Sequence, residues 1–162
     1  MKRVFALLFS LLFASTSLAW DDGVVRWRNI VGVITAPGVS NTVAGIHSGG
    51  LPWTVAAGRA RVDLSSGAVT FFVEGLVLVG GDASGTPGPV KSVKGTLVCN
   101  PGSTDDQAVI DTPAVPLDAQ GNADFDGKLS STPPSSCANP LFLIRVAPAD
   151  VWIATGASRT IS

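Results

Sequence analysis

The chain has 162 residues and a formal net charge of −1, and only 14% of its residues are charged. This length suits one domain with a real hydrophobic core. The near-balanced charge gives no reason to expect nucleic acid or an anionic membrane surface as a partner, because both need a concentrated basic patch. A chain poor in Glu, Lys and Met but rich in Gly, Pro, Ser, Thr, Ala and Val favours strands and turns over helices.

The first nineteen residues read as a secretory signal peptide. Lys2 and Arg3 precede a largely apolar run that is too short to span a bilayer. Ser17-Leu18-Ala19 then offers small residues at the −3 and −1 positions of a cleavage site before Trp20. We therefore expect residues 1–19 to be removed and residues 20–162 to form one secreted domain, periplasmic or extracellular. No second apolar run of about 18 residues follows, so no membrane span is expected in the mature chain.

The start of the mature chain predicts a long strand, a loop and a hairpin. Residues 23–34 alternate apolar and arginine side chains before becoming apolar on both faces, which predicts a first strand with an irregularity near Asn29. Residues 35–52 are rich in Gly, Ser, Asn and Pro and are expected to be mostly loop. Residues 58–64 alternate again, and the turn at 65–67 predicts a hairpin whose apolar return strand lies centrally in a sheet.

The second half of the chain predicts further short strands separated by turns. The prolines Pro113 and Pro116 confine any strand near them to a sheet edge, because proline cannot donate to a strand ladder. The other segments that read as strands are residues 90–99, 123–129, 141–146 and 151–155. Seven or eight short strands without a helix predict a single antiparallel β-sandwich, with a small closed β-barrel as the alternative.

Two cysteines, Cys99 and Cys137, form an even count in a chain expected to be secreted. This predicts one disulfide bond between them. In the chain-entropy model, closing the intervening loop stabilises the fold by roughly 4 kcal/mol.

Two loop residues are the candidates for a ligand site. His47 is the single histidine, and it lies in a glycine-rich loop beside Ser48, which suggests a general base next to a nucleophile or a solvated loop residue. Trp53 follows Pro52 at the end of the same loop, where it either offers a flat apolar face to a ligand or caps the core. No nucleophile-elbow motif occurs in the sequence, so no catalytic residue is assigned.

An acidic segment is the candidate for a metal site. Asn122, Asp124 and Asp126 match the opening of a calcium loop. The match ends where the bidentate glutamate belongs, since that position is Pro133. Alternation along a strand also explains the two aspartates without a metal, so neither a metal nor a cofactor is expected.

Three hypotheses about function follow. The first is a secreted, non-catalytic binding or interaction module whose ligand is an unidentified protein or carbohydrate. The second is a self-associating structural subunit of the cell envelope that adds its N-terminal strand to a neighbour's sheet edge. The third is a hydrolase that uses His47.

Overall fold

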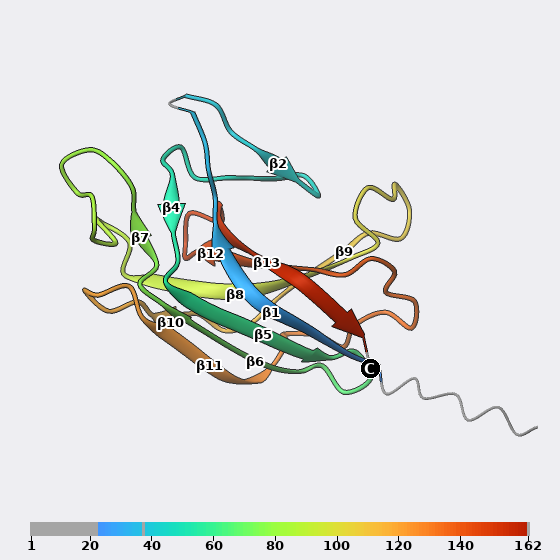
Figure 1. The fold of residues 1–162 in the computed structure, drawn as a ribbon. Helices are drawn as coiled ribbons and strands as arrows, with labels where there is room; N and C mark the ends of the chain where they lie inside the picture. The colour runs from blue at the N-terminus through green and yellow to red at the C-terminus, as the bar shows by residue number, and fades with distance from the viewer. Residues whose placement is uncertain (1–22, 37, 162) are drawn as a thin grey trace, which may run out of the picture.

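The computed structural model describes residues 23–36 and 38–161, and within these ranges the regular structure consists of β-strands (Figure 1). The strands in chain order are β1 (Val24–Gly32), β2 (Thr42–Val43), β3 (Ile46–His47), β4 (Trp53–Thr54), β5 (Ala57–Asp63), β6 (Ala68–Glu74), β7 (Val77–Leu78), β8 (Ser92–Cys99), β9 (Ala108–Asp111), β10 (Val115–Pro116), β11 (Ala123–Lys128), β12 (Leu141–Val146) and β13 (Trp152–Ile161). The described ranges hold no helix with the length and apolarity of a membrane span. The expected signal peptide, residues 1–19, lies outside the described residues.

Nine of these strands form one antiparallel sheet that curls on itself. Their order is β10-β8-β12-β13-β1-β5-β6-β11, and β9 also pairs with β8. The strands at the two ends of this path, β10 and β11, contact each other beside the turn that joins them. In that turn the Asp118 amide donates a 3.0 Å hydrogen bond to the Asn122 carbonyl. The predicted all-β antiparallel class is confirmed, and the layers that face each other are parts of one curled sheet.

Aromatic side chains fill the space that the curled sheet encloses. Phe142 on β12 lies with its ring centroid 5.4 Å from that of Trp27 on β1 and 5.7 Å from that of Phe71 on β6. A Cβ atom added to Gly95 on β8 would lie 2.7 Å from Phe142 and 2.9 Å from Phe71. Opposite walls of the sheet therefore meet at Gly95, where the packing leaves no room for a side chain.

The hairpin of β5 and β6 forms where the alternation predicts it. Its turn is closed by Asp63, whose Oδ1 accepts hydrogen bonds from the Ser65 hydroxyl (2.6 Å) and from the Ser65 and Ser66 amides (2.9 and 3.1 Å). These bonds lower the pKa of Asp63 to about 2, and the bond from the Ser65 hydroxyl has the largest effect. Gly67 takes a φ of 70°, a conformation that side chains other than glycine rarely adopt.

Three segments differ in detail from the expectations. The return strand ends at Glu74, because Gly75 takes a φ of 63° and the chain resumes as the short strand β7. Along β1, the alternation of buried and exposed residues changes phase at Asn29. The register between β1 and β13 does not shift there, whereas the pairing of β1 with β5 ends at Trp27. Residues 35–52, expected to be mostly loop, contain the small β2–β3 ribbon.

The last strand is longer than expected and brings the two ends of the described chain together. β13 has ten residues, and its register with β1 runs from Val25 opposite Ile161 to Gly32 opposite Ala154. β1 thus lies inside the sheet between β13 and β5. Strands β9 and β10, on either side of Pro113, pair with β8 at one edge, as the prolines predict.

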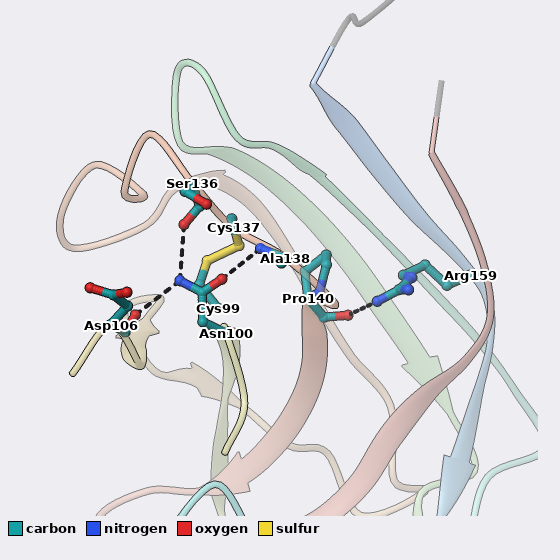
Figure 2. Close-up of a disulfide and its surroundings, with 8 residues drawn as sticks. All are labelled: Cys99, Asn100, Asp106, Ser136, Cys137, Ala138, Pro140 and Arg159. Carbon is teal, nitrogen blue, oxygen red and sulfur yellow. Dashed lines mark hydrogen bonds between the residues drawn. A yellow bond between two sulfur atoms is a disulfide. The ribbon is translucent and has the colours of Figure 1, made fainter. Parts of the chain in front are cut away.

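The predicted disulfide between Cys99 and Cys137 is present and joins the end of β8 to the loop before β12 (Figure 2). Asn100 holds the same two segments together: its Oδ1 accepts a 2.7 Å bond from the Ala138 amide, and its Nδ2 donates to the Asp106 and Ser136 carbonyls at 2.9 and 3.0 Å. Asn100 also takes a φ of 51°, which asparagine tolerates better than most residues. Hydrogen bonds and the covalent bond therefore fix one and the same loop.

Candidate functional site

The two residues predicted to form a ligand site, His47 and Trp53, have different surroundings. His47 is exposed on β3, and its Nδ1 lies 3.0 Å from the Thr42 hydroxyl of β2. Trp53 is only 6% exposed and belongs to the core cluster, where β4 pairs with β7. Trp53 also lines a surface groove, whereas His47 does not.

The hydroxyl group of Ser48, next to His47, forms hydrogen bonds with the backbone of its own loop. Ser48 is buried, and its Oγ accepts a 2.9 Å hydrogen bond from the Asn41 amide and donates a 3.1 Å bond to the Gly49 carbonyl. The next residues along the loop are tied to β13, because the Gly49 amide donates to the Trp152 carbonyl at 2.8 Å. These contacts give Ser48 a structural role in holding the loop on the sheet.

The predicted calcium-loop residues lie at the start of β11 and on its exposed side. Asn122 closes the preceding turn, since its Nδ2 donates to Asp118 Oδ2 at 3.0 Å and its Oδ1 accepts from the Gly75 amide at 3.2 Å. The Asn122 amide also donates to the Asp118 carboxylate and lowers the pKa of that group. Asp124 and Asp126 are exposed two residues apart on the strand. Among the described residues, no group of three or more His, Cys, Asp or Glu side chains is placed to hold a metal ion.

The groove beside Trp53 has a volume of about 580 Å³ and lies where β13 begins and β12 ends. Its floor includes Trp53, Leu78 and Ile153, which are each at most 6% exposed. Val90 and Lys91 belong to its lining, as do Leu51 and the turn residues 147–149. Among the residues that line the groove, Lys91 is the one with a charged side chain. An apolar floor with a single cation at the side suits an apolar ligand that carries a negative group.

The sequence indicated one wall of this groove and missed the others. Trp53 and the glycines before it were recognised as a loop that ends in an aromatic residue. Val90, Lys91 and the β12–β13 turn are distant in the sequence, and no motif connects them. The signal available was the Gly- and Pro-rich composition of residues 80–89, which is typical of loops that shape binding sites.

A cluster of four charged side chains that the sequence did not predict lies on β8, β9 and β12 and in the turn between β12 and β13. Lys94 Nζ contacts Asp111 Oδ2 at 2.7 Å and Asp150 Oδ1 at 2.6 Å. Arg145 Nη1 donates to Asp111 Oδ1 at 3.0 Å, and the Thr96 hydroxyl donates to the same oxygen at 2.7 Å. Lys94 and Arg145 face each other in the strand register, and Asp111 and Asp150 each contact both of these adjacent cations.

The cluster favours the charged forms of Asp111 and Lys94. Burial by itself would raise the pKa of Asp111, but hydrogen bonds from Lys94 and Thr96 and the charge of Arg145 hold it below its usual value of 3.8. Burial likewise opposes the charged form of Lys94, yet its bonds to Asp111 and Asp150 raise its pKa above the usual 10.5. The four charged side chains thus pair with one another across strands, which points to a structural role in joining them.

Comparison with known proteins adds no relative: no family model, no curated protein and no solved structure matches this chain.

Proposed function

We propose that this protein is a non-catalytic binding module that works outside the cytoplasm and takes an apolar, negatively charged small molecule into the groove beside Trp53. The disulfide between Cys99 and Cys137 supports an oxidising compartment, since such bonds form and persist there. The groove is the observation that carries the proposed binding function.

Three properties of the groove support this proposal. Buried core residues, among them Leu78 and Ile153, form its floor, so a bound apolar group continues the core without disturbing the sheet. Leu51, at its side, is 53% exposed, and covering it releases water from apolar surface. The ammonium group of Lys91 offers a partner to a carboxylate or sulfonate at the end of the ligand.

The non-catalytic part of the proposal rests on the neighbourhood of His47. The hydroxyl of Ser48 is buried and bonded to the loop backbone, and the His47 ring bonds to the Thr42 hydroxyl. A serine nucleophile needs a base within hydrogen-bond reach and a third group that orients the base. The hydrogen bonds of Ser48 and His47 instead hold the loop in place.

Strand donation by a self-associating subunit has no comparable support. β1 is bonded to β13 over most of its length and to β5 over its first half. Donation of β1 to a neighbour would require this central strand to leave its own sheet. For the same reason, deletion of residues 20–34 is expected to unfold the monomer.

The groove is tested with 8-anilinonaphthalene-1-sulfonate, a probe that combines an apolar ring system with one negative charge. Titration of the oxidised protein, read by probe fluorescence and by energy transfer from tryptophan, is expected to give saturable binding at one site. Lys91→Glu is expected to weaken binding about tenfold, because it replaces attraction at the groove by repulsion. Lys128→Glu makes the same charge change on exposed β11, outside the groove lining, and serves as the matched control.

Both variants change exposed residues, so their unfolding midpoints are expected to match that of the original protein. A third variant, Ala149→Trp, places a large side chain at the groove and is expected to weaken probe binding by filling part of the space. Equal binding by the original protein, Lys91→Glu and Ala149→Trp would overturn the proposal. Non-saturable binding, or equal weakening by Lys91→Glu and Lys128→Glu, would do the same.

A further inference from the structure

The outer surface of β1 and β5 carries four arginines that the proposed groove does not use. Arg26 and Arg28 alternate with the buried Trp27 on β1, and Arg59 and Arg61 alternate with a buried alanine on β5. Alternation along each strand turns all four arginines away from the core. We call Arg26, Arg28, Arg59 and Arg61 the arginine face. Together with Thr70 and Phe72 of β6 they line a shallow groove of about 430 Å³.

The arginines of this face lie on two adjacent paired strands. Arg26 lies directly opposite Arg61 in the register of β1 and β5, and like charges in such a pair repel. Among residues 23–36 and 38–161, Arg28, Arg59 and Arg61 form no ion pair with a carboxylate. Arg28, Arg59 and Arg61 are therefore open to an anion from outside the described chain.

One of the four guanidinium groups is already oriented by a neighbour. The Arg59 Cζ atom lies 4.9 Å from the centroid of the Phe72 ring on β6. This cation–π contact lays the side chain along the sheet rather than out into solvent. Less side-chain entropy is therefore lost when Arg59 binds an anion.

We infer that the arginine face binds an acidic polysaccharide through its sulfate or carboxylate groups. Arginine donates two parallel hydrogen bonds to such groups, which a lysine cannot reproduce. Arginines two residues apart on one strand lie about 6.6 Å apart at the backbone, and neighbouring strands lie about 4.8 Å apart. Several cations at these spacings favour a polymer with repeated negative groups over a single small anion, because each added contact is made within one chain.

Two other polyanions fit this face less well. Single-stranded nucleic acid gains much of its affinity from bases stacked on aromatic rings, and the one aromatic ring on the outer side of this groove, Phe72, already faces Arg59. A membrane surface favours large apolar side chains that enter the lipid. The exposed large apolar side chains of the described residues, such as Ile34 and Val79, lie outside the groove lining.

The inference is tested with defined polymers and the oxidised chain. Heparin supplies sulfate groups, polygalacturonate supplies carboxylates, and dextran is the neutral control; binding is measured by calorimetry between about 50 and 200 mM salt. The double variant Arg59→Gln/Arg61→Gln is expected to lose about tenfold in affinity and to reduce the slope of log affinity against log salt by about 2. Lys128→Gln removes one positive charge on exposed β11, outside both grooves, and is expected to change affinity less than about twofold.

A third variant, Arg59→Lys/Arg61→Lys, keeps the charge and removes the planar guanidinium groups. It is expected to keep the salt slope and to lose part of the affinity. Absence of binding to both acidic polymers would overturn the inference. An affinity loss in Lys128→Gln as large as that in Arg59→Gln/Arg61→Gln would also overturn it. Tighter binding to single-stranded DNA or to phosphatidylglycerol vesicles would overturn the choice of polysaccharide. These outcomes are independent of the groove beside Trp53, which is read separately with the fluorescent probe.

Discussion

Removal of the carboxylate at Asp111 tests the charged cluster most directly. Asp111 accepts hydrogen bonds from Lys94, Thr96 and Arg145 at 2.7, 2.7 and 3.0 Å. The side chains of Lys94 and Arg145 are only 15% and 10% exposed, so Asp111→Asn leaves two buried cations that share the single carboxylate of Asp150.

The size of the effect follows from the exposure of the pair. Breaking a fully buried ion pair by removing one partner costs about 3–5 kcal/mol. Asp111 is 30% exposed and Asp150 still neutralises part of the charge, so we expect a loss of about 2–3 kcal/mol in the free energy of unfolding. With a slope of about 2 kcal/mol per molar urea, the unfolding midpoint falls by about 1–1.5 M.

The assay is urea unfolding of the oxidised protein, followed by tryptophan fluorescence. Asp124→Asn, on the exposed side of β11, is the control and is expected to change stability by less than about 0.5 kcal/mol. In a cycle with Lys94→Met, the costs of the two single variants are expected not to add, with a coupling of about 1–2 kcal/mol. Additive costs, or an Asp111→Asn cost as small as that of the control, would refute the reasoning.

The same cluster predicts the direction of the pH dependence. The pKa of Asp111 is lowered in the folded state, so its contribution to stability is full above its usual pKa of 3.8 and is lost as pH falls through the lower folded value. The difference between the original protein and Asp111→Asn is therefore expected to shrink in that acid range. The pKa of Lys94 is raised, so its contribution is full below 10.5 and is lost as pH rises through the higher folded value.

Three further substitutions test the core and the crosslink. Trp53→Ala is expected to cost about 3–5 kcal/mol in urea unfolding, because the side chain is 6% exposed; a cost near zero would place Trp53 outside the core. Gly95→Ala is expected to cost about 1–3 kcal/mol by pressing on Phe142, and an unchanged midpoint would show that the rings can shift. Cys99→Ala/Cys137→Ala opens a loop with a sequence separation of 38 and is expected to cost about 4 kcal/mol, which calorimetry of the double variant measures.

Local patterns were sufficient to predict several strands and the disulfide. The hairpin of β5 and β6 follows from strict alternation around a glycine turn, and both signals lie within a few residues of each other. The end of the return strand at Gly75 was not predicted, because the apolar run continues beyond it and only the positive φ marks the break. The full length of β13 was also missed, since pairing with β1, distant in the sequence, stabilises its polar second half.

The sites depend on contacts that no local pattern records. Lys94, Asp111 and Arg145 come from three strands, and each taken alone reads as an ordinary outward-facing charge. In the sequence, the arginine face appears only as two pairs of arginines that alternate with buried residues. The net charge of the chain sums all charges and therefore does not reveal that these four lie together. Strand pairing converts two ordinary pairs into one concentrated patch.

The register of β13 has a consequence for how the molecule can be attached to something else. Ile161 lies beside Val25 at one end of the curled sheet, while Ile153, eight residues earlier on the same strand, lines the groove at the other. Eight steps of about 3.3 Å place roughly 26 Å of strand between the groove and either end of the described chain. A tether or a fused domain at residue 24 or 161 would therefore leave from the end opposite the groove. The paired ends could also be joined by a short linker, with new termini opened in an exposed loop, to give a circular permutant with the same sheet.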